Sequence, residues 1–427
     1  MSFSRAVALR FVFILAVSLA AAKLGHAAGP WLYEGGTPDM GTATAGRQAL
    51  AEDASTARGN PAGMAFLDRS EVLIGLQPFK LTLKFDSGSD TDVEGNDGGD
   101  AGDFIQAGGL YAVHKLTDTW AVGLYAGSAF ALKLNYDQDW VGRYQIQRRS
   151  LITAHLFPSI AYRLTEWLSI GGGIGLESGT LYQKTAINNM LDDLPDGRLR
   201  FKDDSIEPFA QLGILMEPKN GTRIGAIYTS SAEHTFKDGL QLRGLGPTLE
   251  AGLETAGLLG NRVEFKVKRP QQVQTSLYQD LTERLAMMAG LGWQDFSSFG
   301  RVQVSIRSST PDSFTSNRNF KDAWHFALGA RYRLDDRWSV SSGMALDTSP
   351  VRNADRTPDA PADRQIRAGA GLQYKRSEDT TLGLTYTYVD LGDGKLDSDG
   401  GPLGGRVQGK YKDAHIHFVG VQLRRQY

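Results

Sequence analysis

The sequence has no cysteine among its 427 residues. Disulfide bonds, thiolate metal sites and a cysteine nucleophile are therefore excluded. It also lacks a charge excess, because 46 Lys and Arg against 48 Asp and Glu give a net charge of −2. A dedicated nucleic-acid-binding protein usually shows a basic excess, so that class is disfavoured. After residue 28 there is no run of about 18 apolar residues, and no transmembrane helix is expected.

The first 27 residues have the parts of a secretory signal peptide. Arg5 and Arg10 supply positive charge, and the apolar run 11–22 is too short to span a bilayer as a helix. Small residues at Gly25 and Ala27 precede a cleavage site before Ala28. We therefore predict a signal peptide at residues 1–27. The alternative, an N-terminal membrane anchor, is disfavoured by the short run.

The rest of the chain is rich in alternating segments and in glycine, with 50 Gly residues. In residues 120–132, Trp120, Val122 and Leu124 fall on one face of a strand, and small residues fall on the other. Soluble sandwiches show the same alternation, but their strands are typically only about 5–6 residues long. Strands of this length suit a tilted crossing of a bilayer. Comparable segments are 168–182, 223–236, 323–332, 338–346, 364–374, 382–389 and 414–427.

Short polar turns alternate with long connections. Short turns are expected at 116–119, 164–167, 218–221, 281–284, 334–337 and 376–379, and long loops at 86–103, 133–149, 183–205, 238–261, 308–321, 347–363 and 391–411. Short turns at one end and long loops at the other are typical of an outer-membrane barrel. Trp120, Trp167 and Trp338 leave equivalent turns and are expected in an aromatic girdle, although strands favour tryptophan anyway.

The turns also give the number of strands. Six turns join six pairs, one strand precedes them near 70–85, and one follows at 412–427, which gives about 14 strands. Residues 302–307 are interpreted as a continuation of the strand at 285–293 beyond a break at 295–298. The chain ends on the aromatic Tyr427, as the assembly signal of outer-membrane proteins does. The predicted fold is all-β, a transmembrane antiparallel β-barrel at 70–427 with long extracellular loops.

Residues 28–69 do not alternate and precede the first strand. Apolar residues at both ends of this segment favour a packed plug over a free leader. We therefore predict that residues 28–69 form an N-terminal hatch in the lumen.

The stretch 41–67 resembles the hatch of the FadL-type outer-membrane transporters of long-chain fatty acids and other hydrophobic compounds. It carries the motif Asn60-Pro61-Ala62, followed by Gly63 and Met64. Residues 288–299 and 326–351 resemble the same family. The resemblance implies a hatch-plugged barrel of 14 strands and no coupled energy source. It also implies ligand capture at an extracellular apolar groove, passage to an inner pocket, and lateral exit where the third strand is kinked, near the Asn-Pro-Ala segment.

The residues themselves supply candidates for the ligand path. The loop 238–261 is leucine-rich, and its candidates for ligand binding are Leu245, Leu249, Leu253, Leu258 and Leu259. A helix that only packs on its neighbours is an equal alternative. Gly127 in the third strand is the candidate for the kink, although glycine is also common in barrels for packing reasons. Arg143, Arg148 and Arg149 lie in a predicted loop and could meet a carboxylate, lipopolysaccharide or only water.

Other constellations point to no further chemistry. The acidic loop 86–103 begins like a calcium loop, but its twelfth position is Ala101 instead of Glu. His415 and His417 share a strand face without an evident third metal ligand. No nucleophile elbow or phosphate-binding loop is present. We expect no enzymatic activity, no cofactor and no metal.

These features predict passive transport of hydrophobic small molecules across the outer membrane of a Gram-negative bacterium. Expected partners are the hydrophobic ligand, outer-membrane lipid and lipopolysaccharide, and the barrel assembly machinery; no nucleic acid is expected, and the protein should be a monomer. The alternatives are a general porin or an adhesin-like barrel, and a barrel enzyme that acts on lipids. Single-channel conductance separates the transporter from the general porin, because a barrel sealed by its hatch is expected to show little open conductance.

Overall fold

The computed structural model describes residues 33–255, 259, 262–307, 312–361 and 363–427. The predicted signal peptide lies outside these residues. Among them, no helix has both the length and the hydropathy to cross a bilayer.

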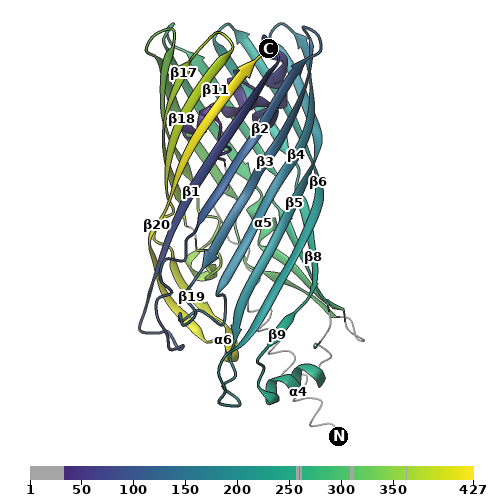
Figure 1. Ribbon diagram of the computed structural model, residues 1–427, viewed down its shortest axis with the longest axis vertical. Helices are drawn as coiled ribbons and strands as arrows, with labels where there is room; N and C mark the ends of the chain where they lie inside the picture. Colours follow the sequence, from purple (N-terminus) through teal and green to yellow (C-terminus); the bar gives the residue numbers. More distant parts are fainter. Residues whose placement is uncertain (1–32, 256–258, 260–261, 308–311, 362) are drawn as a thin grey trace.

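The chain forms a closed antiparallel β-barrel (Figure 1). Its sheet holds 16 strands, of which β9 (Gln241–Arg243) and β19 (Lys395–Asp399) only pair with the ends of β6 and β20, so 14 strands build the wall. Pairing of β1 with β20 closes the barrel. The predicted strand number is confirmed. The wall strands are β1 (Glu71–Ser87), β2 (Phe104–Lys115), β3 (Trp120–Asn135), β4 (Arg148–Thr165), β5 (Leu168–Ile187), β6 (Gly197–Lys219), β7 (Thr222–Thr229), β11 (Gln272–Asp280), β12 (Leu285–Gln294), β15 (Ala323–Arg333), β16 (Trp338–Asp347), β17 (Gln365–Lys375), β18 (Thr380–Asp390) and β20 (Arg406–Gln426).

Alternation along the strands separates a lipid-facing surface from the lumen. On β20, Val419 and Val421 point outward and are exposed, whereas Phe418 is fully buried inside. Ile174 on β5 is 71% exposed, an environment that suits an apolar side chain in lipid and not in water. At the short-turn end the rings of Trp120 and Tyr162 lie 4.5 Å apart, as part of the expected aromatic girdle.

Four neighbouring strands break before the long-loop end. Beyond the break, β8 (Ala232–Gly239), β10 (Arg262–Arg269), β13 (Arg301–Arg307) and β14 (Asp312–Asn317) pair in a separate four-stranded sheet. The break predicted at 295–298 is confirmed, because the short helix α5 (Phe296–Phe299) separates β12 from β13. The Asp295 side chain accepts a hydrogen bond from the Ser298 backbone and begins this helix. The wall therefore runs to the long-loop end on one side, whereas on the other side it is interrupted before the separate sheet.

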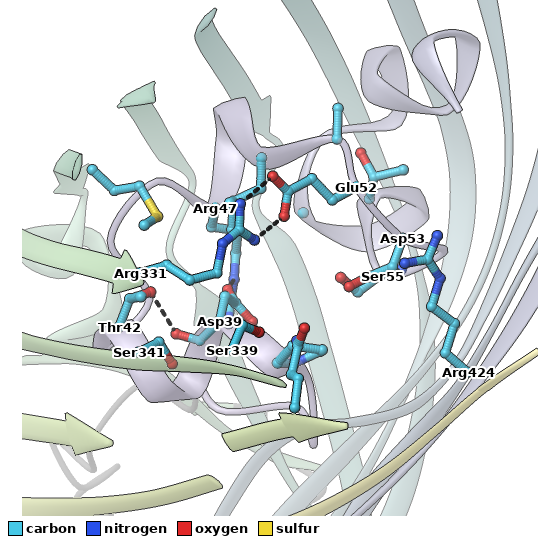
Figure 2. A pocket seen from close by; sticks show the side chains of 17 residues that line it. Asp39, Thr42, Arg47, Glu52, Asp53, Ser55, Arg331, Ser339, Ser341 and Arg424 are labelled. Carbon is cyan, nitrogen blue, oxygen red and sulfur yellow. Dashed lines mark hydrogen bonds and ion pairs between the residues drawn. The ribbon is translucent and has the colours of Figure 1, made fainter. Parts of the chain in front are cut away.

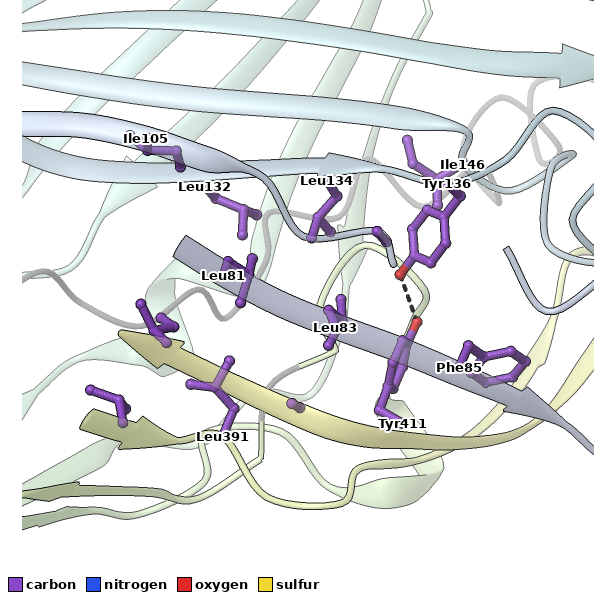
Figure 3. Close-up of a cluster of buried hydrophobic side chains, with 14 of the residues drawn as sticks. Leu81, Leu83, Phe85, Ile105, Leu132, Leu134, Tyr136, Ile146, Leu391 and Tyr411 are labelled. Carbon is purple, nitrogen blue, oxygen red and sulfur yellow. Dashed lines mark hydrogen bonds between the residues drawn. The ribbon is translucent and has the colours of Figure 1, made fainter. Parts of the chain in front are cut away.

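A hydrophobic cluster fills the long-loop half of the lumen beside β1, β3 and β20 (Figure 3). It includes Leu81 and Leu83 of β1 and Leu134 of β3, and the hydroxyl groups of Tyr136 and Tyr411 lie 3.0 Å apart within it. Side chains therefore occupy the lumen beside these three strands. The small helices α6 (Gly401–Gly404) and η3 (Asn353–Asp355) belong to the loops at this end.

The described part of the hatch, residues 33–69, lies inside the barrel near the short-turn end and the C-terminus (Figure 1). It folds into η1 (Pro38–Thr42), α2 (Arg47–Leu50), α3 (Thr56–Gly59) and η2 (Pro61–Phe66). Ion pairs between hatch and wall join Glu34 to Arg367 and Glu52 to Arg331. The predicted luminal position of the hatch is confirmed.

Candidate functional site

The Asn-Pro-Ala motif fixes the hatch to one side of the wall. Asn60 is 1% exposed and begins η2, because its Oδ1 accepts a hydrogen bond from the Ala62 backbone at 3.1 Å. Its Nδ2 donates to the carbonyl of Gln48 at 2.7 Å and to that of Ile214 in β6 at 3.0 Å. One side chain therefore joins two parts of the hatch to each other and to the barrel. Pro61, Ala62, Gly63 and Met64 follow it, all buried.

Glycines in β3, β5 and β6 let the motif approach the wall. A Cβ on Gly213 would lie 2.1 Å from Oδ1 of Asn60, and one on Gly171 would lie 2.6 Å from the Ala62 nitrogen. A Cβ on Gly123 would lie 2.2 Å from the sulfur of Met64. At Gly213 and Gly171 a Cβ would meet the Asn60 side chain or the hatch backbone, and at Gly123 it would displace the Met64 side chain. Glycine at these three positions therefore leaves room for the hatch.

Strand pairing in the wall is interrupted between β2 and β3. The two strands pair from Lys115↔Ala121 to Gly109↔Gly127, and the next bridge between them is Gly102↔Leu134. Between these points β2 keeps its pairing with β1, and β3 keeps its pairing with β4, but no pairing joins 103–108 to 128–133 within the described chain. The wall therefore has a local gap in its strand pairing.

A bulge in β3 accompanies the gap. The register between β3 and β4 shifts between Ser128 and Phe130, which leaves Ala129 unpaired. Gly127, the predicted kink, is the last paired residue before the gap, and a Cβ there would lie 2.6 Å from the Gly108 carbonyl. The structure thus places Gly127 at the edge of the irregular part of β3.

An almost wholly apolar chamber lies in the long-loop half of the lumen, next to the filled cluster, and Phe130 contacts both. Its volume is about 30 Å³, and it lies where the separate sheet leaves the wall. Phe130 of the β3 bulge reaches this chamber. The other apolar lining side chains are Leu151, Phe236, Val267, Pro270, Phe296 and Phe299.

A buried charge cluster forms one end of the chamber. Glu177 of β5 is fully buried and lies 2.5 Å from His155 Nε2, 2.8 Å from His234 Nε2 and 2.7 Å from Arg269 Nε. The four residues belong to β5, β4, β8 and β10, so the cluster ties the separate sheet to the continuous wall. These three partners compensate the charge of the buried Glu177 carboxylate, and removal of one of them would leave part of that charge uncompensated.

A polar cavity of about 40 Å³ follows the chamber toward the hatch. Arg269 and the chamber's neighbour His155 line it from the wall, and Arg47 and Arg58 line it from the hatch. Its lining contains no carboxylate side chain among the described residues, and it includes Ala129 of the bulge. The cavity therefore touches the apolar chamber, the hatch and the gap in the wall.

A third cavity, of about 60 Å³, lies on the other side of the hatch (Figure 2). It shares Arg47 and Gly59 with the polar cavity, so these hatch residues separate the two. Burial alone would raise the pKa of Glu52 here, but the charge and hydrogen bonds of Arg331 outweigh burial and hold that pKa below its usual range. Burial raises the pKa of Asp53, and the charge of Arg424 offsets only part of this effect.

The leucine-rich loop is only partly an exposed surface. Leu249 and Leu253 lie on α4 (Pro247–Thr255) and are buried, with Leu245 and Leu259 packed against them; Leu258 lies outside the described residues. Exposed apolar side chains come instead from the loop between β5 and β6, where Met190, Leu191 and Leu194 are exposed. This short loop gave no sequence signal, because three apolar residues among polar ones show no periodicity.

Hydrogen bonds hold this loop against the leucine-rich one. Asn189 Oδ1 accepts from the Gly246 backbone at 2.9 Å, and Asn189 Nδ2 donates to the Gly244 carbonyl at 2.8 Å. The two loops therefore form one apolar tip at the long-loop end.

The three arginines predicted in one loop go to three different places. Arg143 lies in the loop and pairs with Asp196 at 2.8 Å. The loop prediction is wrong for Arg148 and Arg149, which begin β4. Adjacent strand residues point to opposite faces, so Arg149 is buried in the lumen against Asp359 while Arg148 points outward.

No group of three His, Asp or Glu side chains in the described chain could hold a metal ion. Asp97 of the acidic loop instead accepts hydrogen bonds from the backbone and the hydroxyl of Ser87. His417 lies on the outer face, where its Nδ1 is 2.7 Å from the hydroxyl of Tyr386.

A family model described as outer membrane protein transport protein (OMPP1/FadL/TodX) matches residues 18–427. A long-chain fatty acid transport protein of Salmonella typhi is 24% identical over 406 residues, which cover 85% of this chain and 87% of that protein. Outer membrane protein P1 of Haemophilus influenzae is 25% identical, with 87% and 88% covered.

Solved structures share the fold. A FadL homologue of Pseudomonas aeruginosa superimposes with a TM-score of 0.84 at 20% identity, covering 93% of this chain and 99% of that one. The toluene transporter TbuX of Ralstonia pickettii gives a TM-score of 0.65 at 15% identity, with 92% and 99% covered. At these identities the likeness shows the architecture alone.

Proposed function

Because the chain belongs to the outer membrane protein transport proteins (OMPP1/FadL/TodX), we propose that it carries long-chain fatty acids passively into the cell through the cavities described above. The family consists of outer-membrane transporters of hydrophobic compounds in Gram-negative bacteria, and they are not enzymes. The observation that carries the proposal is the arrangement of an apolar chamber, a polar cavity and a gap in the wall in direct contact.

Capture takes place at the apolar tip. Met190, Leu191 and Leu194 present apolar surface to water, and the packed leucines of α4 support it. Exposed apolar surface of this kind binds the alkyl chain of an amphipathic molecule. The candidates of the leucine-rich loop remain Leu245, Leu249, Leu253, Leu258 and Leu259. Of these, Leu245, Leu249, Leu253 and Leu259 support the apolar tip from within.

Inside the barrel, the alkyl chain enters the apolar chamber and the carboxylate enters the polar cavity. Aromatic side chains such as Phe130 and Phe236 give the alkyl chain of the ligand an apolar environment. Because the chamber volume is only about 30 Å³, these side chains must move to admit the ligand. Arg58 and Arg47 favour the head group, since the cavity lining offers cations and no carboxylate. The two adjoining environments match the two ends of one amphipathic ligand.

Exit occurs sideways through the gap between β2 and β3. Ala129 lines both the bulge and the polar cavity, so a molecule in the cavity already touches the opening. The hatch, which Asn60 ties to β6, blocks the direct route along the axis. A molecule leaving here meets the lipid-facing side of the wall and avoids water.

A neutral aromatic hydrocarbon is the second candidate. At the polar cavity, Arg47 is paired with Asp39 at 2.5 Å, and Arg269 is paired with Glu177 at 2.7 Å. Charge neutralisation of this kind weakens the attraction for a carboxylate and favours an uncharged ligand in the aromatic chamber.

Uptake in a strain that lacks its own transporter tests the proposal and separates the two ligands. The wild-type chain should restore uptake of labelled oleate, and Arg58→Gln should reduce it several-fold while leaving toluene uptake intact. Arg301→Gln, at an exposed position of β13, is the matched control. Equal oleate uptake by Arg58→Gln and the wild type would refute the role of the polar cavity. High open-channel conductance of the purified barrel would favour a porin instead.

A further inference from the structure

Three cations stand side by side on the outer surface of the barrel, at the long-loop ends of β4, β5 and β6. The strand register pairs Arg148 with Lys184 and Lys184 with Arg200. Directly paired residues on one face of an antiparallel sheet have Cβ atoms about 5 Å apart. These three residues, named here the cation row, therefore form a continuous line of positive charge across three strands.

The aromatic ring of Tyr182 contacts both arginines of the cation row. Tyr182 lies two residues closer to the membrane on β5, and its register partner on β6 is the exposed Lys202. The guanidinium carbons of Arg148 and Arg200 each lie 5.4 Å from the centroid of the Tyr182 ring. Contacts between cations and an aromatic ring hold the two guanidinium groups in place.

The cation row has no acidic counterpart. Within the described residues, neither arginine of the row nor Lys184 takes part in an ion pair, and Nε of Arg148 is buried there without a hydrogen-bond acceptor. Like charges directly opposite each other on a sheet are destabilising. Three of them in succession on a folded wall indicate that an anion from outside the chain belongs there.

Neighbouring strands of the barrel show the contrast. Four outward lysines of β1, β3 and β20 near the same end each have an aspartate partner. The pairs are Lys80–Asp100 at 3.2 Å, Lys84–Asp413 at 3.4 Å, Lys133–Asp103 at 2.6 Å and Lys412–Asp86 at 2.9 Å. These four lysines are therefore neutralised within the chain, whereas the three adjacent cations of the row have no such partner among the described residues.

The height of the row relates it to the membrane surface. On the same outer faces, Ile152 of β4 and Ile206 of β6 are 41% and 67% exposed, as expected for lipid-facing side chains. Arg148 lies four residues beyond Ile152, about 10 Å farther along the barrel axis for a strand tilted at about 40°. Long arginine and lysine side chains reach back over several ångströms toward the head groups. The row is thus placed just outside the apolar band.

We propose that the cation row, together with Tyr182 and Lys202, binds the phosphate groups of lipopolysaccharide in the outer leaflet. Guanidinium groups bind phosphate through two parallel hydrogen bonds, and the ammonium group of Lys184 supplies a point charge between them. The Tyr182 hydroxyl can donate a further hydrogen bond. This site lies outside the lumen and is independent of the proposed transport function.

Native mass spectrometry of the purified full-length barrel in detergent tests the site. The probes are lipid A with two phosphates, dephosphorylated lipid A, and inorganic phosphate. The variant Arg148→Gln/Lys184→Gln/Arg200→Gln is compared with the matched control Lys80→Gln/Lys84→Gln/Lys412→Gln. The control removes the same number of positive charges, but from lysines that have aspartate partners. We expect the row variant to bind phosphorylated lipid A at least tenfold more weakly than the wild type and the control variant.

A second readout is independent of the bound lipid. Without lipid A, the row variant should melt at the same temperature as the wild type or higher, because like-charge repulsion has been removed. Equal lipid A affinity of the row variant and the wild type would overturn the proposal. So would equal binding of dephosphorylated lipid A, or binding of inorganic phosphate alone. If the triple variant fails to form a heat-modifiable barrel, the single variant Lys184→Gln takes its place under the same criteria.

Discussion

Gly127 of β3 pairs with Gly109 of β2, and this glycine pair is where the ladder between the two strands stops. Neither residue has a side chain to fill the space beyond the last pair, and a Cβ on Gly127 would lie 2.7 Å from the Gly109 Cα. The bulge at Ala129 follows two residues later. The gap in the wall therefore begins where two strands pack through bare backbone.

Ala129→Leu should reduce ligand uptake while the barrel assembles normally. The larger side chain would occupy the polar cavity of about 40 Å³ at the point where it meets the gap. We expect the initial rate of oleate uptake to fall at least threefold. Ala289→Leu makes the same change on the lipid-facing side of β12 and should leave the rate unchanged. Wild-type rates in a well-folded Ala129→Leu protein would contradict the lateral route.

Asn60→Leu should loosen the hatch without preventing barrel formation. The substitution removes three hydrogen bonds and leaves the buried carbonyls of Gln48 and Ile214 without this donor. Each buried group left unsatisfied costs about 1–3 kcal/mol, but none of these bonds joins two wall strands. Uptake should fall, and a bulky residue at Pro61 should act in the same direction.

Heat-modifiable migration checks the assembly of the Asn60 variant, and labelled oleate checks its transport. Asn220→Leu, in the exposed turn between β6 and β7, is the matched control. If Asn60→Leu transports as well as the wild type, the Asn-Pro-Ala motif has no role in gating.

Strand positions and their number could be predicted because alternation is a local property of the sequence. The contacts that make the site could not. Glu177 meets His155, His234 and Arg269 across four strands, and nothing in the sequence states the register that brings them together. Both faces of β4 are polar at Arg148 and Arg149, so the alternation that marks a strand is absent there. The sequence therefore predicts a loop at these two residues. The hatch was found through its family resemblance and its lack of alternation.

The C-terminal aromatic residue should matter for assembly more than for the finished barrel. The Tyr427 side chain is 64% exposed, and its backbone nitrogen donates to the Ser70 carbonyl at 2.9 Å. Tyr427→Ala keeps that backbone bond but removes the aromatic ring, so we expect less barrel in the outer membrane at equal synthesis. Tyr427→Phe should restore the yield. Equal heat-modifiable yield from the alanine variant would show that the ring is not read during assembly.

The ion pair between Glu52 and Arg331 should make the hatch sensitive to acid. The pKa of Glu52 is lowered in the folded protein, so its contribution is fully present above the unfolded pKa of about 4.3 and is lost as the pH falls through the folded value. Both side chains are about a quarter exposed, so the pair contributes about 1 kcal/mol. Open events in single-channel recordings should be rare at pH 7 and more frequent below about pH 4. Glu52→Gln should show the frequent openings already at pH 7, whereas Glu378→Gln in an exposed turn should not. A Glu52→Gln channel as quiet as the wild type at pH 7 would show that this pair does not hold the hatch closed.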